Sequence, residues 1–322
     1  MGIELLLLIA GLVLVVIGAE VLIDGAAGLA RRCGISEFII GLTIVALGTS
    51  APEMVVSFIS SAEGNSDMAV GNVFGSNIFN TALILGLSAI IAPVAVTRGN
   101  LRRDIPVNIG ITGLLILLGL KQTLFGIGSN GLSRAEGAVF IALFIWYMIA
   151  SFVKDKENRQ TKKAEDENGK TMPLGKALVY IVGGLAALIF GGRMFVDHAH
   201  AIAKMAGFSD KFIAITVLAA GTSLPELATS CVAAAKGKGQ LALGNIIGSN
   251  TSNILLILGG SALIHPLGMD HITLTDDAAL LACALSLVIF SWTGKRNRIE
   301  RFEGVILLLL QAAYFVYLFK MR

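Results

Sequence analysis

Residues 48–53 are Gly-Thr-Ser-Ala-Pro-Glu, and the pattern returns at residues 221–226 as Gly-Thr-Ser-Leu-Pro-Glu. Each copy places a glutamate, Glu53 or Glu226, inside a stretch that is otherwise apolar. A charged side chain in the middle of a bilayer costs about 3 kcal/mol on insertion scales. A chain that accepts this cost twice, with the same neighbouring residues, is expected to use both glutamates for a function.

The composition predicts a membrane protein. Of the 322 residues, 55% are hydrophobic and only 15% are charged, and the mean hydropathy is +0.79. A soluble domain has no interior large enough for so much apolar surface, so the lipid bilayer is its expected partner. We find no nucleic-acid-binding motif in the sequence. Cys33, Cys231 and Cys283 lie far apart in or beside apolar runs, which favours packing over a disulfide or metal role.

The apolar segments predict an all-α integral membrane protein with ten transmembrane helices. A spanning helix needs about 20 apolar residues. The expected spans are 3–29, 36–61, 68–92, 103–120, 134–153, 174–203, 210–235, 241–264, 274–293 and 302–319. The hydrophilic residues 154–173 form the expected linker between two five-helix halves, residues 1–153 and 174–322.

The positions of the basic residues predict the orientation. With ten spans, most Lys and Arg residues fall in loops on one side, among them Arg31, Arg102, Lys154 and Lys236. Cytoplasmic loops carry such an excess. We therefore expect a multi-pass protein of the cytoplasmic (inner) membrane with both termini outside and the linker inside. The N-terminus has no basic region, so residues 5–17 are expected to be a retained helix.

The two motif copies belong to a longer internal repeat. Residues 43–93 and 216–266 align without a gap, and about half of the positions are identical. The predicted helices of the two copies are five spans apart, an odd number, so the copies enter the membrane from opposite sides. The sequence therefore predicts two inverted repeats, whose shared site lies near the bilayer midplane.

Each copy combines a predicted helix break with a set of oxygen ligands. Pro52 disfavours helix in the residue before it, so we expect a break near residues 48–51 and a new half-helix capped by Thr49 or Ser50. The oxygens come from carboxylates, hydroxyls, amides and freed backbone carbonyls. The candidate ligands are Ala46, Thr49, Ser50, Glu53, Ser76, Asn80, Ala219, Thr222, Ser223, Glu226, Ser249 and Asn253. Such a set suits calcium, sodium or protons rather than zinc or copper.

Several residues also have simpler structural interpretations. Ser50 and Glu53 match a capping box, which would make the glutamate a helix cap; inside an apolar span its cost argues against this. The motif glycines are expected to allow close helix packing. Asn77 and Asn250 remain open between interhelical contacts and the site, and Asn72 and Asn245 are expected to have structural or water-contacting roles. The remaining acidic residues near span ends, including Asp104, Asp276 and Asp277, are expected to be solvated, and His198 and His200 to be interfacial.

The doubled motif resembles the two α-repeats of the calcium/cation antiporter superfamily, in particular its prokaryotic sodium/calcium exchanger branch. The resemblance covers essentially the whole chain: residues 71–80, Gly-Asn-Val-Phe-Gly-Ser-Asn-Ile-Phe-Asn, and 244–253, Gly-Asn-Ile-Ile-Gly-Ser-Asn-Thr-Ser-Asn, follow the two Pro-Glu segments. It implies exchange of about three sodium ions for one calcium by alternating access, with the first and sixth helices sliding across a static core. It implies no enzyme activity and no cofactor, and we expect a functional monomer.

The resemblance also assigns roles to individual positions. It implies a central calcium site formed by Glu53 and Glu226 with Thr49 and Thr222. It implies one sodium site formed by Ala46, Ser50 and Ser76 with Glu226. A second would be formed by Ala219, Ser223 and Ser249 with Glu53, and Asn80 and Asn253 would line the middle.

This chain departs from some members of the superfamily at two places. Asn253 stands where the second repeat often carries Asp, which in certain branches is linked to potassium dependence; Asn argues mildly against potassium transport. The short linker implies that the large calcium-sensing domains of animal members are absent.

Other functions use similar residues. A calcium/proton antiporter would protonate the same two glutamates, and a cation channel would use the same oxygens without counter-ion exchange. An intramembrane hydrolase is disfavoured because the chain has neither His-Glu-x-x-His nor Gly-x-Ser-x-Gly.

Overall fold

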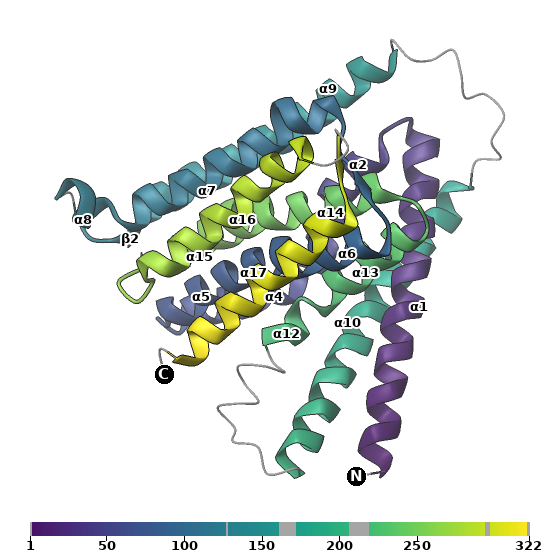
Figure 1. The fold of residues 1–322 in the computed structure, drawn as a ribbon, viewed down its shortest axis with the longest axis horizontal. Coiled ribbons are helices and arrows are strands. Elements are labelled where there is room, and N and C mark those ends of the chain that lie inside the picture. Colours follow the sequence, from purple (N-terminus) through teal and green to yellow (C-terminus); the bar gives the residue numbers. More distant parts are fainter. Residues whose placement is uncertain (1, 127, 161–171, 206–218, 294–296, 321–322) are drawn as a thin grey trace.

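The computed structural model describes residues 2–126, 128–160, 172–205, 219–293 and 297–320, and most of them are helical (Figure 1). The first half contains α1 (Gly2–Cys33), α2 (Glu37–Ile40), η1 (Gly41–Val45), α3 (Ala46–Thr49), α4 (Ala51–Ala62), α5 (Ser66–Ile78), η2 (Phe79–Leu85), α6 (Gly86–Ile91), η3 (Asn100–Asp104), α7 (Ile105–Gly119), α8 (Lys121–Phe125) and α9 (Arg134–Gln160). The second contains α10 (Leu174–Met205), α12 (Ala219–Thr222), α13 (Leu224–Ala235), α14 (Gly239–Ser252), η5 (Asn253–Leu258), α15 (Gly259–Ile264), α16 (Leu274–Trp292) and α17 (Arg301–Lys320). Elements marked η are π-helical.

Seven helices in the described residues are long and apolar enough to cross a membrane, and the bent pair 37–49 and 51–62 raises the number to eight. Two of the ten predicted spans are not in this count. The span predicted at 103–120 corresponds to η3 and α7, whose α-helical part has only 15 residues. The span predicted at 210–235 begins outside the described residues, which resume at α12. The number ten stays a prediction, as does most of the 154–173 linker, of which 161–171 are not described.

The two longest helices, α1 and α10, pack against each other in antiparallel fashion. Each has 32 residues, which at 1.5 Å per residue exceeds the thickness of a bilayer core. Glycines let the backbones approach: a Cβ at Gly18 would lie 3.0 Å from the Gly184 carbonyl oxygen, and one at Gly11 would lie 2.9 Å from that of Gly191. Figure 1 shows the pair projecting from the remaining helices. An interface of small residues presents few interlocking side chains along its length.

The second half contributes α14, which crosses the broken segment of the first half. A Cβ at Gly244 would collide with the Phe38 carbonyl, and one at Gly248 would collide with the Leu42 carbonyl. The packing role expected for these two glycines is confirmed. The equivalent glycines of the first copy, Gly71 and Gly75, have no such neighbour among the residues described.

Two short ladders also join the halves and are the exception to an all-helical chain. Strand β1 (Val94–Ala95) pairs antiparallel with β4 (Arg298–Ile299), and β2 (Gly131–Leu132) pairs with β3 (Leu267–Gly268). Each ladder takes one strand from each half of the chain. They hold loop ends of the two halves together on either side of the buried helices.

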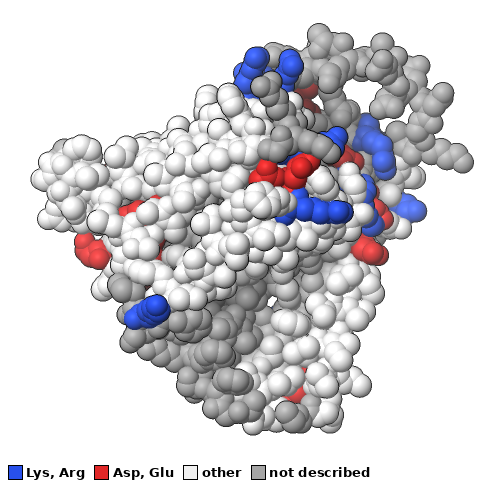
Figure 2. Space-filling view, in the orientation of Figure 1, with Lys and Arg blue, Asp and Glu red and all other residues white. Residues whose placement is uncertain are grey.

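The surface is largely uncharged in the view of Figure 2, with most Lys and Arg side chains grouped on one side. In Figure 1 the start of α1 and the end of α17 lie on one side of the molecule, and the end of α9 and the start of α10 lie on the other. This arrangement agrees with a protein that crosses a bilayer and has its basic loops on one face.

Three acidic residues are buried, contrary to the expectation of solvation. Asp104 is 2% exposed, pairs with Arg103 at 2.8 Å and accepts a hydrogen bond from Tyr147 at 3.3 Å. Asp276 and Asp277 are 9% and 7% exposed. Charged residues at the predicted ends of spans suggested solvent contact, but neighbouring helices cover them. Tyr314 donates to Asp276 Oδ1 at 2.8 Å, whereas Asp277 Oδ2 has no partner among the described residues.

Candidate cation site

The helix break predicted before Pro52 is present. Helix α3 ends at Thr49, Ser50 has φ −80° and ψ 9°, and α4 begins at Ala51 with a bend of 50° between the two segments. The second copy has the same arrangement, with Ser223 at φ −88° and ψ 8° between α12 and α13. The break frees the serine side chains from a helical environment and places both glutamates in the first turn of a half-helix.

The two serines do not cap their own helices, because each one reaches the glutamate of the other copy. Ser50 Oγ donates to Glu226 Oε1 at 2.8 Å, and Ser223 Oγ donates to Glu53 Oε1 at 2.9 Å. Neither serine makes a side-chain cap, so the expected capping and the capping-box alternative are both wrong. The two motifs, distant in sequence, form one reciprocal cluster.

Further predicted residues surround this cluster. Ser50 Oγ also contacts Ser249 Oγ at 3.1 Å. Thr222 lies beside the Glu53 carboxylate and Thr49 lies beside that of Glu226. All but Thr222 are at most 2% exposed. The structure therefore brings hydroxyls from both copies to both carboxylates.

The remaining predicted ligands differ in how the structure places them. The Ala46 carbonyl accepts bonds from Ser50 N at 3.0 Å and Thr49 Oγ1 at 3.3 Å, so the expectation of a free carbonyl there is wrong. Ser76 is buried in α5, one turn before Asn80. Ala219 begins α12, but its contacts are not described.

Four buried oxygens of the predicted ligands lack a hydrogen-bond partner among the described residues. They are Glu53 Oε2, Glu226 Oε2, Asn80 Oδ1 and Asn253 Oδ1. Buried polar atoms are paired in the great majority of cases, and an unpaired one is costly. Four unpaired acceptors, two of them on carboxylates, fit a bound cation that would be surrounded by oxygen.

The electrostatics of the cluster also favour a cation. The two carboxylates lie within range of mutual repulsion, and none of the ion pairs found in the described chain includes either of them. Two like charges in a low-dielectric interior need a compensating positive charge or a proton. A cluster of three or more His, Cys, Asp or Glu, as a transition-metal site would need, is absent from the described residues.

Amides outside the predicted ligand set support the two half-helices. Asn72 Nδ2 donates to the Glu53 carbonyl at 3.1 Å and to Ser57 Oγ at 2.9 Å. Asn245 Nδ2 donates in the same way to Ser230 Oγ at 2.9 Å. The structural role expected for both asparagines is confirmed, and their serine partners were not singled out from the sequence.

The question left open for Asn77 and Asn250 is answered by their contacts. Asn77 Nδ2 donates to the Asn250 carbonyl at 3.4 Å, and its Oδ1 accepts from Asn253 Nδ2 at 3.0 Å. Asn250 Nδ2 donates to Thr81 Oγ1 at 2.8 Å. Both asparagines are interhelical contacts beside the cluster. Residues at equivalent positions of the two copies therefore touch, a pairing that an inverted repeat favours.

Comparisons with known proteins cover nearly the whole chain. The family model described as sodium/calcium exchanger protein covers residues 3–153 and 176–320. A putative antiporter, CaxA of Alkalimonas amylolytica, is 40% identical over 97% of this chain and 97% of its own length. The sodium/calcium exchanger MaX1 of Methanosarcina acetivorans is 34% identical over 98% of this chain and 99% of its own length. A solved structure of the sodium-calcium exchanger NCX_Mj, soaked with sodium and strontium, superposes with a TM-score of 0.83 at 33% identity, over 98% of each chain.

Proposed function

This chain belongs to the sodium/calcium exchanger protein family, and we propose that it is a secondary active antiporter that exchanges sodium for calcium across the cytoplasmic membrane. The observation that carries the proposal is the reciprocal cluster around Glu53 and Glu226, in which each carboxylate keeps one unpaired oxygen. Carboxylate, hydroxyl and amide oxygens are the ligands that calcium and sodium take in proteins.

The proposed ligand assignment is the one that the resemblance to the exchanger family implies. The central calcium site consists of both carboxylates with Thr49 and Thr222, and Asn80 and Asn253 line it. The sodium sites flank it: one has Ala46, Ser50 and Ser76 with Glu226, and the other has Ala219, Ser223 and Ser249 with Glu53. The serine–glutamate hydrogen bonds that cross between the copies support this division.

Exchange follows from competition for the same carboxylates. One calcium, or several sodium ions, neutralises the two charges, whereas an empty site keeps them repelling one another and resists passage through the apolar barrier. The protein is therefore expected to exchange ions rather than leak them. If three sodium ions move per calcium, each cycle carries net charge and responds to the membrane potential.

Alternating access needs one part of the protein to move against the other. The interface between α1 and α10 is lined by glycines, and both helices extend beyond the rest of the molecule (Figure 1). We propose that this pair slides across the core that holds the site. We further propose ten spans in two inverted halves, with both termini outside and the 154–173 linker in the cytoplasm, and a monomer as the functional unit.

Calcium uptake into proteoliposomes separates this function from its rivals. Vesicles loaded with sodium and vesicles without sodium are compared at one fixed pH, with no potential imposed. We expect uptake only from the sodium-loaded vesicles. Uptake that follows an imposed pH gradient and ignores sodium would instead identify a calcium/proton antiporter, and continuous single-channel current would identify a channel.

A further inference from the structure

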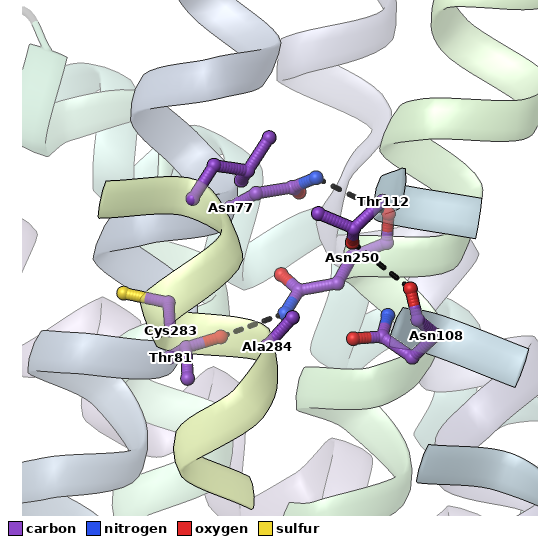
Figure 3. Close-up of a pocket in the computed structure, with 8 residues that line it drawn as sticks. Asn77, Thr81, Asn108, Thr112, Asn250, Cys283 and Ala284 are labelled. Atoms are coloured by element: carbon purple, nitrogen blue, oxygen red, sulfur yellow. Dashed lines mark hydrogen bonds between the residues drawn. The ribbon is translucent and has the colours of Figure 1, made fainter. Parts of the chain in front are cut away.

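A small polar cavity lies beside the cation cluster, between α5, η2, α7, α14 and α16 (Figure 3). Its polar lining consists of Asn77, Thr81, Asn108, Thr112 and Asn250, and α16 supplies the apolar wall. About 10 Å³ is open to the centre of a water molecule. That is the space one water needs. None of the proposed ion ligands lines the cavity.

Two atoms on the cavity wall lack partners among the described residues. They are Asn108 Nδ2, a donor, and Asn250 Oδ1, an acceptor. Their side chains are 1% and 4% exposed, so bulk solvent does not satisfy them. In Figure 3 the Asn108 and Asn250 side chains both line the cavity, and Asn250 Nδ2 is directed at Thr81. Buried amide groups of this kind are normally paired with protein or with ordered water.

The chemistry of the lining distinguishes water from a cation. The cavity offers one amide donor as well as acceptors, and it contains no carboxylate. Thr112 Oγ1 donates its hydrogen to the Asn108 carbonyl at 2.9 Å, so its lone pairs remain available to accept. One donor and two acceptors give a water molecule three hydrogen bonds, the usual number for a buried water.

We propose that this cavity holds one ordered water molecule, bound by Asn108, Asn250 and Thr112, and that it positions Asn253 at the cation site. The water accepts from Asn108 Nδ2 and donates to Asn250 Oδ1 and Thr112 Oγ1. It thereby fixes the α7 face against α14 at the level of the cluster. Asn108 acts as a positioning residue and does not touch the transported ion.

A chain of hydrogen bonds links the water to the site. The Asn250 side chain, held by the water on one side, donates to Thr81 on the other at 2.8 Å. The Asn250 carbonyl accepts a hydrogen bond from Asn77 Nδ2 at 3.4 Å. Asn77 Oδ1 in turn accepts one from Asn253 Nδ2 at 3.0 Å. With the Asn253 nitrogen held in this way, its Oδ1 is left without a partner among the described residues. That oxygen is one of the four assigned to the site.

The water is expected on one side of the repeat only. The first half lines the cavity with Asn108 and Thr112 from α7, whereas the corresponding helix of the second half, α16, contributes only Leu280, Cys283 and Ala284. Asn77 therefore has no counterpart of Asn108 beside it, and its Oδ1 accepts a hydrogen bond directly from Asn253 Nδ2. The two halves of the site are held by different means although their ligands are the same.

A structure at a resolution that shows ordered water tests the site without reference to transport. In the wild type we expect a density peak within hydrogen-bonding distance of Asn108 Nδ2 and Asn250 Oδ1. Asn108→Leu replaces the amide by methyl groups of similar size, so it removes the donor and should remove the peak, and the near-isosteric Thr112→Val should weaken it. The water site is refuted by an empty wild-type cavity, or by a peak that gains anomalous signal when thallium replaces sodium, since that peak would be a cation.

Transport kinetics test the positioning role, and this second test rests on the proposed function. We expect Asn108→Leu to raise the KM for calcium about five-fold with little change in kcat. Asn108→Ser, which keeps a donor and leaves room for a second water, should stay within about two-fold of wild type. Should Asn108→Leu fail to fold, Thr112→Val supplies the same comparison. An unchanged KM in a variant whose water peak is lost would overturn the role in positioning.

Discussion

Replacing Glu53 by glutamine tests the importance of one charge at the site while keeping its shape. The amide oxygen of glutamine can still accept the Ser223 hydrogen bond, which is 2.9 Å long in the native protein. The first turn of α4 and the bend at Ser50 should remain, because Pro52 fixes them. The change therefore removes a negative charge and little else.

The magnitude follows from Coulomb's law. A calcium ion about 2.4 Å from a carboxylate oxygen gains roughly 14 kcal/mol at an effective dielectric constant of about 20. If the lost hydration of both groups offsets about four fifths of this gain, roughly 3 kcal/mol remains, which corresponds to about 100-fold in affinity. At calcium concentrations near the native KM, transport by Glu53→Gln should be nearly absent.

The assay is uptake of radioactive calcium into sodium-loaded proteoliposomes, with the amount of folded protein checked by gel filtration. Glu63→Gln provides the matched control, because Glu63 is exposed at the end of α4, one helix length from the cluster. The control should transport like the wild type. Wild-type uptake by Glu53→Gln would refute the assignment of this carboxylate to the ion site.

Three further predictions concern the contacts around the site. Ser50→Ala and Ser223→Ala each remove a hydrogen bond to the opposite glutamate, and both should weaken sodium-driven uptake by about ten-fold or more; a loss in only one variant would contradict the reciprocal arrangement. Gly248→Ala should lower the free energy of unfolding by about 1–3 kcal/mol, because its Cβ meets the Leu42 carbonyl, whereas Gly113→Ala, with open space, should not; thermal unfolding in detergent distinguishes them, and equal behaviour would contradict the close crossing. Asp24→Asn breaks two exposed ion pairs with lysines and should change stability by less than about 1 kcal/mol; a larger loss would mean that these pairs hold the fold.

The helix break could be predicted from the sequence because its cause is local. Pro52 lacks an N–H and restricts the residue before it, so any helix through this position must bend. The approach of the two motifs could be predicted from the repeat alone, since inversion brings equivalent positions together. The structure confirms that residues near Glu53 contact residues near Glu226.

Features that depend on side-chain direction could not be predicted. A serine before Pro-Glu is compatible with capping and with reaching the other copy; only tertiary packing decides which bond forms. The π-helical segments η2 and η5, which carry Asn80 and Asn253, have no sequence pattern of their own, although such segments often occur at functional sites. Burial of Asp104 depends on Tyr147, which approaches from a different helix.

The most direct test of the central claim is to locate bound calcium by its anomalous scattering in crystals soaked without sodium. We expect one peak at about 2.3–2.6 Å from oxygens of both the Glu53 and the Glu226 carboxylates. A calcium ion bound to one carboxylate alone, or to neither, would contradict a single site shared by the two halves of the chain.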